Sequence, residues 1–306
     1  MRTSVAVLLG GTSPEREVSL KSGHAVASAL AAEGYRVTEC DVRSDDLSAL
    51  AGGTYDCAFI ALHGGFGENG GIQALLEEEG LPYCGSGPEA SGLAMDKWLA
   101  KARFVEEGIP TPTGRLVDGR NWRSRVEGFL IEAGLPIVVK PRSQGSSVGV
   151  RIVRESGELA GALEGALRYD GEAIVEKAVA GRELTVGILA DEALPIIEIV
   201  PLCEFFTYEA KYVKGRTDYF PAPALAESAA SSVKRFALAA HEALGCRDFS
   251  RVDLILGAEG PMILEVNTIP GFTETSLLPM AARATGIGFG ELCKTIVELA
   301  LKRVPA

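Results

Sequence analysis

The stretch RVDLILGAEGPMILEVN, residues 251–267, holds two apolar runs around a glycine-containing turn, which is typical of a β-hairpin. If residues 257–261 form the loop, Leu256 pairs with Met262, and counting outward places Asp253 opposite Glu265. Strand alternation puts Asn267 on the same face as Glu265. Like charges directly across a strand pair repel each other, so the hairpin needs a reason to keep both carboxylates.

Two interpretations of these carboxylates stay open at this point. They can lie on a solvated face and tolerate each other, or they can share a hard divalent cation. Both sit within apolar runs, which indicates a half-buried sheet, and unpaired carboxylates are costly to bury. Oxygen ligands around a small cation suit Mg²⁺.

Length and composition restrict the class of protein. The 306 residues, 47% of them hydrophobic, are enough for two or three domains with their own cores. A net charge of −11 argues against broad binding of nucleic acid or of anionic membranes, because both need a basic face. No apolar stretch approaches the ~18 residues of a membrane span, and residues 1–11 read as a first strand rather than a signal peptide. The six cysteines form no C-x-x-C pair, which favours reduced thiols in a cytoplasmic protein.

The first third of the chain alternates strands and helices. Strands are expected at 5–9, 36–42 and 57–64, and helices at 18–32 and 72–80. This order predicts an open parallel sheet, in which ligands bind beyond the carboxyl ends of the strands. Two polar loops fall at such ends, GGTSPERE (10–17) and HGGFGENGG (63–71).

The remainder is expected to be mixed α and β structure, with domain boundaries near residues 90 and 180, giving domains 1–90, 91–180 and 181–306. One long helix is predicted over 89–107, and a loop without periodicity over 203–224. The other expected elements are strands at 135–141, 148–153, 173–179, 182–189 and 194–200, helices at 156–168, 226–244, 275–285 and 289–303, and the hairpin.

Three further stretches carry candidate chemistry. In VVKPRSQGSSVGV (138–150) a strand ends in Lys140 and a Ser/Gly loop follows, whose N–H groups can wrap phosphate oxygens. The alternative is a flexible polar hairpin loop. In IVEKAVAGRE (174–183) a strand edge can read an adenine ring and a carboxylate can hold ribose hydroxyls, or the charges simply mark a strand end. YEAKYVKG (208–215) is either a loop that closes over phosphates or an ordinary exposed loop.

The N-terminal polar loops offer substrate-binding groups. Thr12 and Glu15 have the spacing of a capping box at a helix start, with Pro14 in the first turn. The competing interpretation is that Glu15 receives a substrate ammonium group. Of the three histidines, only His63 falls at a strand end beside glycines, where an exposed imidazole can act.

Taken together, these stretches resemble the D-alanine–D-alanine ligases of the ATP-grasp superfamily. The resemblance runs nearly end to end and rests on LLGGTSPEREVSL, LHGGFGENG, LPYCGSG, MDK, KPRSQGSSVGV, VEK, EAKY, RVD, LEVNTIPGFT and LPMAARA, in that order. It implies a three-domain α/β ATP-grasp architecture with an N-terminal open parallel-sheet domain. It also implies ATP-dependent joining of two D-alanine molecules through an acyl phosphate, for peptidoglycan precursors, in a cytoplasmic homodimer.

The resemblance further implies roles for individual residues. The residues implied for ATP are Lys97, Lys140, Ser147, Glu176, Lys177, Val179, Glu183 and Lys211. Those implied for two Mg²⁺ ions, with Mn²⁺ as a substitute, are Asp253, Glu265 and Asn267. Those implied for binding and reacting the amino acids are Glu15, His63, Ser146, Tyr212, Arg251, Gly271, Ser276 and Leu277.

Two positions depart from the family pattern, since Asn69 stands where Asp is expected and Phe206 where some relatives carry Tyr. Tyr212 favours a dipeptide product over D-alanyl-D-lactate. The competing functions are another ATP-grasp carboxylate–amine ligase, such as a D-alanine–D-lactate ligase, and a non-catalytic nucleotide-binding module. The second would require losses among the predicted site residues, and none is missing.

Overall fold

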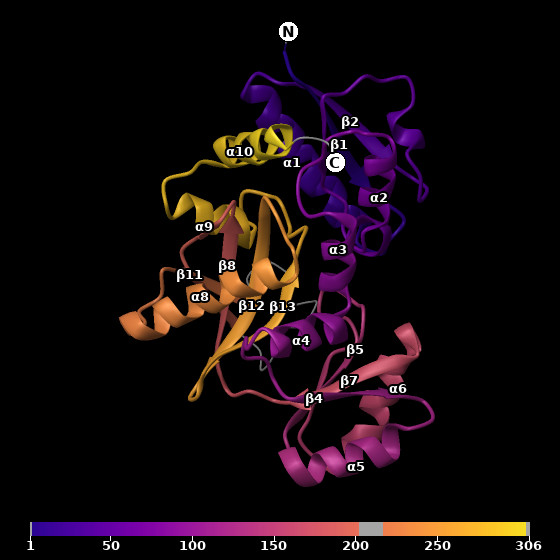
Figure 1. Cartoon of the computed structure of the whole chain (residues 1–306), viewed down its shortest axis with the longest axis vertical. Helices are drawn as coiled ribbons and strands as arrows, with labels where there is room; N and C mark the ends of the chain where they lie inside the picture. Colours follow the sequence, from indigo (N-terminus) through magenta and orange to yellow (C-terminus); the bar gives the residue numbers. More distant parts are fainter. Residues whose placement is uncertain (1, 202–216, 304–306) are drawn as a thin grey trace.

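The structure, a computed structural model, describes residues 2–201 and 217–303, and it contains three sheets (Figure 1). The first sheet has the parallel order β2-β1-β3, formed by β1 (Ser4–Gly10), β2 (Arg36–Val42) and β3 (Cys57–Ile60). Together with helices α1 (Arg16–Ala32) and α2 (Gly71–Glu78), these strands form the expected unit with an open parallel sheet. All seven residues of β1 are buried, as expected for the central strand of a covered parallel sheet.

The second sheet is antiparallel, with the order β4-β7-β5-β6. Its strands are β4 (Gly114–Asp118), β5 (Ile137–Pro141), β6 (Arg151–Val153) and β7 (Glu172–Lys177). Helices α5 (Trp122–Ala133) and α6 (Leu159–Asp170) pack against it around their own apolar cluster. Strand β4 and helix α5 were not among the elements expected from the sequence.

The third sheet has the order β11-β10-β8-β12-β13, with β9 paired to β8. Its strands are β8 (Gly181–Leu189), β9 (Glu192–Ala193), β10 (Ile197–Pro201), β11 (Thr217–Pro221), β12 (Phe249–Gly257) and β13 (Gly260–Asn267). Helix α8 (Glu227–Ala243) packs with Val186 and Ile188 of β8. Between them, a Cβ on Gly187 would meet Leu278 of α9 (Leu277–Arg283), so α8 and α9 cover opposite faces.

The first and third sheets share one hydrophobic core. The rings of Phe59 (β3), Phe249 (β12) and Phe272 lie 5.4–6.5 Å apart, and Phe289 joins them through Phe272. Phe289 begins α10 (Phe289–Lys302), the last helix, which packs on α1 (Figure 1). Helix α10 therefore contributes to the hydrophobic core around the first sheet.

The helix predicted over residues 89–107 is wrong as a single element. The chain forms α3 (Pro88–Met95) and α4 (Lys97–Glu106), separated at Asp96, whose ψ of 92° is extended. The Asp96 carboxylate accepts hydrogen bonds from the N–H groups of Trp98 and Leu99, both at 3.1 Å, and so caps the second helix. The break places Lys97 at a helix start.

The hairpin is confirmed, but its inner register differs from the prediction. Gly257 pairs with Gly260 across a two-residue turn, so Leu256 pairs with Pro261 rather than with Met262. A bulge at Leu264 then restores the ladder, and Asp253 lies opposite Glu265 as predicted.

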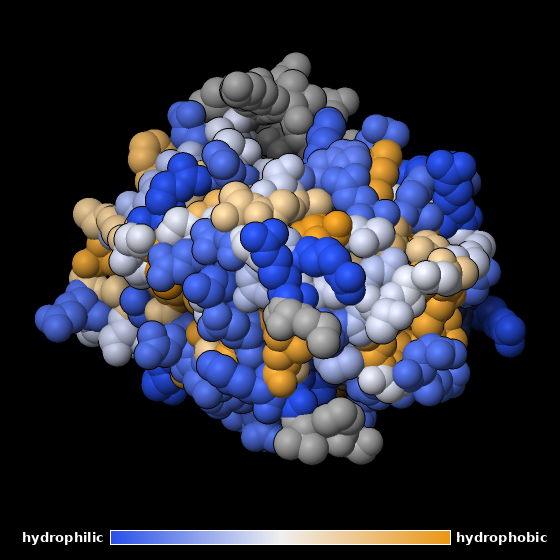
Figure 2. All heavy atoms as spheres, turned by 90° about the horizontal axis from the view of Figure 1, so that it is seen from above, coloured by the Kyte–Doolittle hydropathy of each residue, from blue (hydrophilic) through white to orange (hydrophobic). Residues whose placement is uncertain are grey.

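The remaining short elements are the 3₁₀ turns Ser48–Leu50, Gly65–Gly67 and Ser156–Glu158. In the view of Figure 2 hydrophilic residues dominate the surface, and hydrophobic residues form separate patches between them. Within residues 2–201 and 217–303, no helix is long and apolar enough to cross a membrane. The domain boundaries near residues 90 and 180 remain a prediction.

Candidate active site

A cavity of about 800 Å³ collects side chains from across the sequence. Its walls come from the loops after β1 and β3, the junction of α3 and α4, the Ser/Gly loop after β5, the β12–β13 hairpin and the start of α9. The predicted site residues that line it are Glu15, His63, Lys97, Ser146, Arg251, Glu265, Asn267, Gly271, Ser276 and Leu277.

Other predicted residues do not line this cavity in the structure. They are Lys140, Ser147, Glu176, Lys177, Val179, Glu183 and Asp253. Lys211 and Tyr212 lie outside the described residues.

Glu15 and Ser146 meet across 131 residues of sequence, with the Ser146 hydroxyl donating a hydrogen bond to Glu15 Oε1. Ser146 and Ser147 have positive φ values of 51° and 57°, a conformation that non-glycine residues rarely adopt. Gly145 and Ser146 of this loop line the cavity.

The predicted capping box at Thr12 is wrong. The Thr12 hydroxyl lies 2.8 Å from Asp45, and helix α1 begins after Glu15, whose side chain caps nothing. Ser13 instead accepts the Glu15 N–H at 3.1 Å and donates to the carbonyl of His63 at 2.5 Å. The Glu15 side chain therefore lines the cavity and does not cap the helix.

His63 is held through both ring nitrogens. Its Nε2 lies 3.0 Å from Ser22 Oγ and its Nδ1 lies 3.5 Å from Glu68 Oε1. Ser22 Oγ also accepts the N–H of Phe272 at 3.2 Å, so its own hydrogen is available to Nε2, which favours the tautomer protonated on Nδ1. Ser22 and Glu68 line the cavity too, and sequence analysis assigned neither.

The three predicted metal ligands lie on neighbouring strand positions and each has a protein partner. Arg251 donates to both oxygens of Asp253, at 2.9 and 2.7 Å, and the Thr185 hydroxyl lies 2.6 Å from Oδ1. Lys97 Nζ lies 3.2 Å from Glu265, and Asn267 Oδ1 accepts the N–H of Ile269 at 3.0 Å.

This donor set fits a hard cation, since it holds two carboxylates and an amide oxygen and no softer ligand. In the described ranges, no group of three or more His, Cys, Asp and Glu residues is arranged to hold a metal. The predicted set contains only two such residues, Asp253 and Glu265, with the amide of Asn267 as the third ligand.

Behind the Ser/Gly loop lies a buried ionic cluster. Lys140 Nζ is 2.6 Å from one oxygen of Glu176, and Lys101 Nζ is 3.0 Å from the other. Burial opposes ionisation of Glu176, but the attraction of Lys140 and Lys101 holds its pKa below the ordinary value. Sequence analysis missed Lys101, although it follows Lys97 by one helical turn in α4 and so shares its face.

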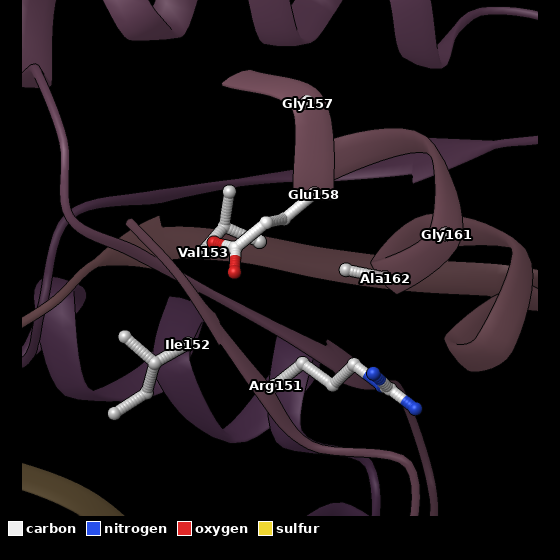
Figure 3. A pocket seen from close by; sticks show the side chains of 7 residues that line it. All are labelled: Arg151, Ile152, Val153, Gly157, Glu158, Gly161 and Ala162. Atoms are coloured by element: carbon white, nitrogen blue, oxygen red, sulfur yellow. The ribbon is translucent and has the colours of Figure 1, made fainter. Parts of the chain in front are cut away.

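A second, smaller cavity of about 390 Å³ lies between β6 and the start of α6, and it contains none of the predicted residues (Figure 3). Glu158 in its wall accepts the N–H groups of Arg154 and Glu155 at 2.8 and 3.2 Å. Its carboxylate therefore serves a helix cap, and the cavity contributes nothing to the candidate site.

Comparison with known proteins identifies the relatives of this chain. The family model described as D-ala D-ala ligase C-terminus matches residues 105–298. The D-alanine–D-alanine ligase of Pelotomaculum thermopropionicum is 46% identical over 99% of this chain and 98% of its own, and that of Geotalea uraniireducens is 46% identical over 98% and 96%. The crystal structure of D-alanine–D-alanine ligase from Bacillus anthracis superposes with a TM-score of 0.88 at 37% identity, over 98% of both chains.

A second structure of the Bacillus anthracis enzyme, complexed with ATP, gives a TM-score of 0.87 at 36% identity, covering 99% of this chain and 98% of that one. The fold is therefore the three-domain ATP-grasp architecture that the sequence predicts. Identity at this level over almost the whole length shows that the chain belongs to the D-alanine–D-alanine ligase family.

Proposed function

We propose that this chain joins two D-alanine molecules into D-alanyl-D-alanine with ATP, by way of an acyl phosphate, to supply peptidoglycan precursors. The observation that carries the proposal is the shared cavity. It gathers an acceptor for ammonium at Glu15, cations at Lys97 and Arg251, and an acidic hairpin at Glu265, as this reaction needs.

For the nucleotide, we assign the phosphates to Lys97, Lys140 and the Ser/Gly loop that contains Ser147. Lys97 already faces the acidic hairpin, and its Nζ donates to the carbonyl of Gln144 in that loop at 2.7 Å. The adenine is assigned to the strand end at Glu176, Lys177 and Val179, the ribose to Glu183, and the γ-phosphate to Lys211, by family resemblance.

Asp253, Glu265 and Asn267 would hold Mg²⁺, which supplies charge neutralisation to the phosphates of ATP when bound. Arg251 and Lys97 now neutralise Asp253 and Glu265 in the structure. Both cations are thereby kept beside the place where phosphate oxygens would lie. Transfer of a phosphoryl group depends mainly on such positioning and charge.

In the first step, a carboxylate oxygen of the first D-alanine attacks the γ-phosphorus, and ADP leaves. In the second, the deprotonated amine of the other D-alanine attacks the carbonyl carbon, and phosphate leaves. Glu15, with Ser146 hydrogen-bonded to it, would bind the first ammonium group, and Tyr212 would extend this contact. Arg251 and the Gly271 N–H would stabilise the tetrahedral oxyanion, a contribution typically worth about 10²–10³ in rate per donor.

The carboxylate of the second D-alanine is assigned to Ser276 and the N–H of Leu277. Ser276 Oγ accepts the N–H of Thr273 at 3.0 Å, which orients the hydroxyl beside Gly271. His63 lines the same cavity, but its Nε2 is already hydrogen-bonded to Ser22. We therefore assign His63 to substrate positioning, and the proton of the amine to the departing phosphate.

The test is to incubate the purified protein with ATP, MgCl₂ and D-alanine, and to measure phosphate release and dipeptide by mass spectrometry. We expect stoichiometric phosphate and D-alanyl-D-alanine, and no product from L-alanine. Glu265→Gln should abolish turnover with the fold intact, whereas Glu259→Gln in the exposed turn of the same hairpin should leave the rate unchanged. Turnover of L-alanine alone, or a depsipeptide formed in preference with D-lactate, would refute the substrate assignment.

We also propose a cytoplasmic homodimer, on the family resemblance and on the use of ATP. Light scattering of the purified protein tests whether it is a dimer. A mass near 32.2 kDa, that of one chain, at all concentrations would contradict the proposed homodimer.

A further inference from the structure

Lys101 is almost completely buried, and it does not line the cavity. It is 6% exposed, its partner Glu176 is 3% exposed, and Lys140 on the other side of Glu176 is 6% exposed. Lys, Glu and Asp residues are rarely buried to this extent unless their charges are paired. The cluster therefore holds two cations against one carboxylate.

Lys101 is fixed by contacts that bind no ligand. Its Nζ donates to Thr111 Oγ1 at 2.8 Å and to the carbonyl of Pro112 at 2.6 Å. Thr111 Oγ1 in turn donates to the carbonyl of Ile263 in β13 at 2.9 Å. The ammonium group is thus anchored between α4, the segment before β4, and the hairpin, at ion-pair distance from Glu176.

Glu176 keeps acceptor capacity despite its two lysines. Its Oε1 faces Lys140 at 2.6 Å. Its Oε2 is buried, and within the described residues no group donates to it with hydrogen-bond geometry, although Lys101 Nζ lies 3.0 Å away. A carboxylate oxygen has more than one lone pair, so Oε2 can accept a hydrogen from a ligand while it stays beside Lys101.

Once a nucleotide binds, the two lysines no longer pair equally with Glu176. Lys140 is assigned to phosphate oxygens, which compete with Glu176 for its charge. Lys101 remains beside Glu176, because its ammonium group also donates hydrogen bonds to Thr111 and Pro112 in the segment before β4. Lys101 is then the counter-charge that keeps Glu176 ionised.

We propose that Lys101 is a positioning residue that holds Glu176 as an ionised acceptor for the 6-amino group of adenine, and so sets the preference for ATP over a 6-oxopurine nucleotide. This proposal rests on the proposed function, in which Glu176 reads the base. An ionised carboxylate can only accept hydrogen bonds, so it attracts an amino group and repels a 6-oxo group. A protonated Glu176 could donate to the 6-oxo group and would lose this discrimination.

The pKa of Lys101 agrees with this arrangement. Burial lowers the pKa of Lys101 to about 8, with Glu176 opposing the change and Lys140 adding to it. At neutral pH Lys101 therefore still carries most of its charge.

The test replaces Lys101 by methionine, which keeps the length of the side chain and removes the charge. Arg103→Met on the same helix is the matched control, since Arg103 faces solvent and pairs with Glu106 and Glu107. Binding of ADP and GDP is measured by calorimetry, and kcat/KM for ATP and GTP at saturating D-alanine. We expect Lys101→Met to weaken ADP binding about tenfold or more, which corresponds to one lost charge-assisted contact, and to reduce the ATP/GTP ratio. The KM for D-alanine should not change.

A double-mutant cycle with Glu176→Gln separates positioning from a merely structural role. If Lys101 acts through Glu176, Lys101→Met should add little loss of ADP affinity or selectivity in the Glu176→Gln background. Full additivity, or a wild-type ATP/GTP ratio in Lys101→Met, would overturn the proposal. Lys101→Gln, which keeps a donor for Thr111 and Pro112 without the charge, gives the same readouts if the methionine variant does not fold. Absence of ligase activity in the wild type would instead refute the proposed function, and it would be seen separately from ADP affinity.

Discussion

His241 is a titratable side chain buried far from the chemistry. It lies on α8 with 3% exposure, and its Nδ1 is 2.7 Å from Ser250 Oγ on β12. Burial lowers its pKa to about 4, and the nearby charge of Asp191 opposes this change. The unfolded chain, with an ordinary pKa of about 6.5, therefore binds more protons between these values, and stability falls as the pH drops through this window.

We expect His241 to reduce the free energy of unfolding by about 2 kcal/mol between pH 7 and pH 5. Urea denaturation at both pH values measures it. His241→Gln should flatten the pH dependence by that amount. An unchanged slope in His241→Gln would show that the imidazole is not buried in its neutral form.

Some single residues of the site could be predicted from sequence, and others could not. Glu15, Lys97 and Glu265 sit within stretches whose order along the chain is distinctive, so their presence in one cavity was expected. Lys101, Ser22 and Glu68 were missed because their roles come from tertiary contacts. A buried lysine and an exposed lysine on a helix look alike in a sequence until the packing partner is known.

At the scale of elements, the hairpin shows how a correct pairing can follow from an incorrect register. The predicted loop, 257–261, has five residues where the structure has a turn of two, which shifts the inner pairs by one residue, and the prediction contained no bulge. The two offsets cancel, so Asp253 still faces Glu265. Residues 262–264 are all apolar, and such a run gives no side-chain pattern by which the extra residue Leu264 could be recognised.

The contact between α1 and β1 depends on one glycine. A Cβ on Gly23 of α1 would lie 2.4 Å from the Cβ of Leu9 in β1. We expect Gly23→Ala to destabilise the protein by about 1–3 kcal/mol through overpacking, and to raise the KM for D-alanine because Glu15 precedes the same helix. Urea denaturation and steady-state kinetics measure the two effects.

Gly165 supplies the control for that substitution. It lies within α6, and a Cβ there would meet nothing within 4 Å. Gly165→Ala should stabilise the protein by about 0.5–1 kcal/mol, as alanine does in an open helix position. Equal effects of the two substitutions would mean that helix propensity, and not the approach of α1 to β1, governs Gly23.

At the scale of the whole molecule, the end of α10 meets the loop after α2 near Tyr83. Arg303 donates to the Asp248 carboxylate and to the carbonyl of Tyr83, and Asp248 also accepts the N–H of Gly85 at 2.7 Å. Arg247 donates to the Tyr83 hydroxyl at 2.8 Å and lies over its ring. These contacts connect the loop after α2, the start of β12 and the end of α10, and sequence analysis predicted none of them because they join distant segments through ordinary charged residues.

Asp248 is the centre of this connection, and it has a positive φ of 61°. Its side chain is 5% exposed and that of Arg303 is 26% exposed, so solvent screens the pair only in part. We expect Asp248→Ala to lower the free energy of unfolding by about 2–4 kcal/mol, because it leaves Arg303 and the Gly85 N–H without their acceptor and keeps the unfavourable φ. Asp248→Asn should cost less, since asparagine tolerates this conformation and keeps one acceptor oxygen.

The cycle of Asp248→Asn with Arg303→Gln tests whether the pair acts as a unit. If Arg303 stabilises the molecule through Asp248, the double variant should be less destabilised than the sum of the single variants, because each single change strands the opposite charge. Urea denaturation measures the free energy of unfolding of all four proteins. The KM for ATP reports whether the change also displaces the part of the cavity wall that β12 contributes. Strict additivity would show that the end of α10 stabilises the fold by apolar packing on α1 alone, without this ionic connection.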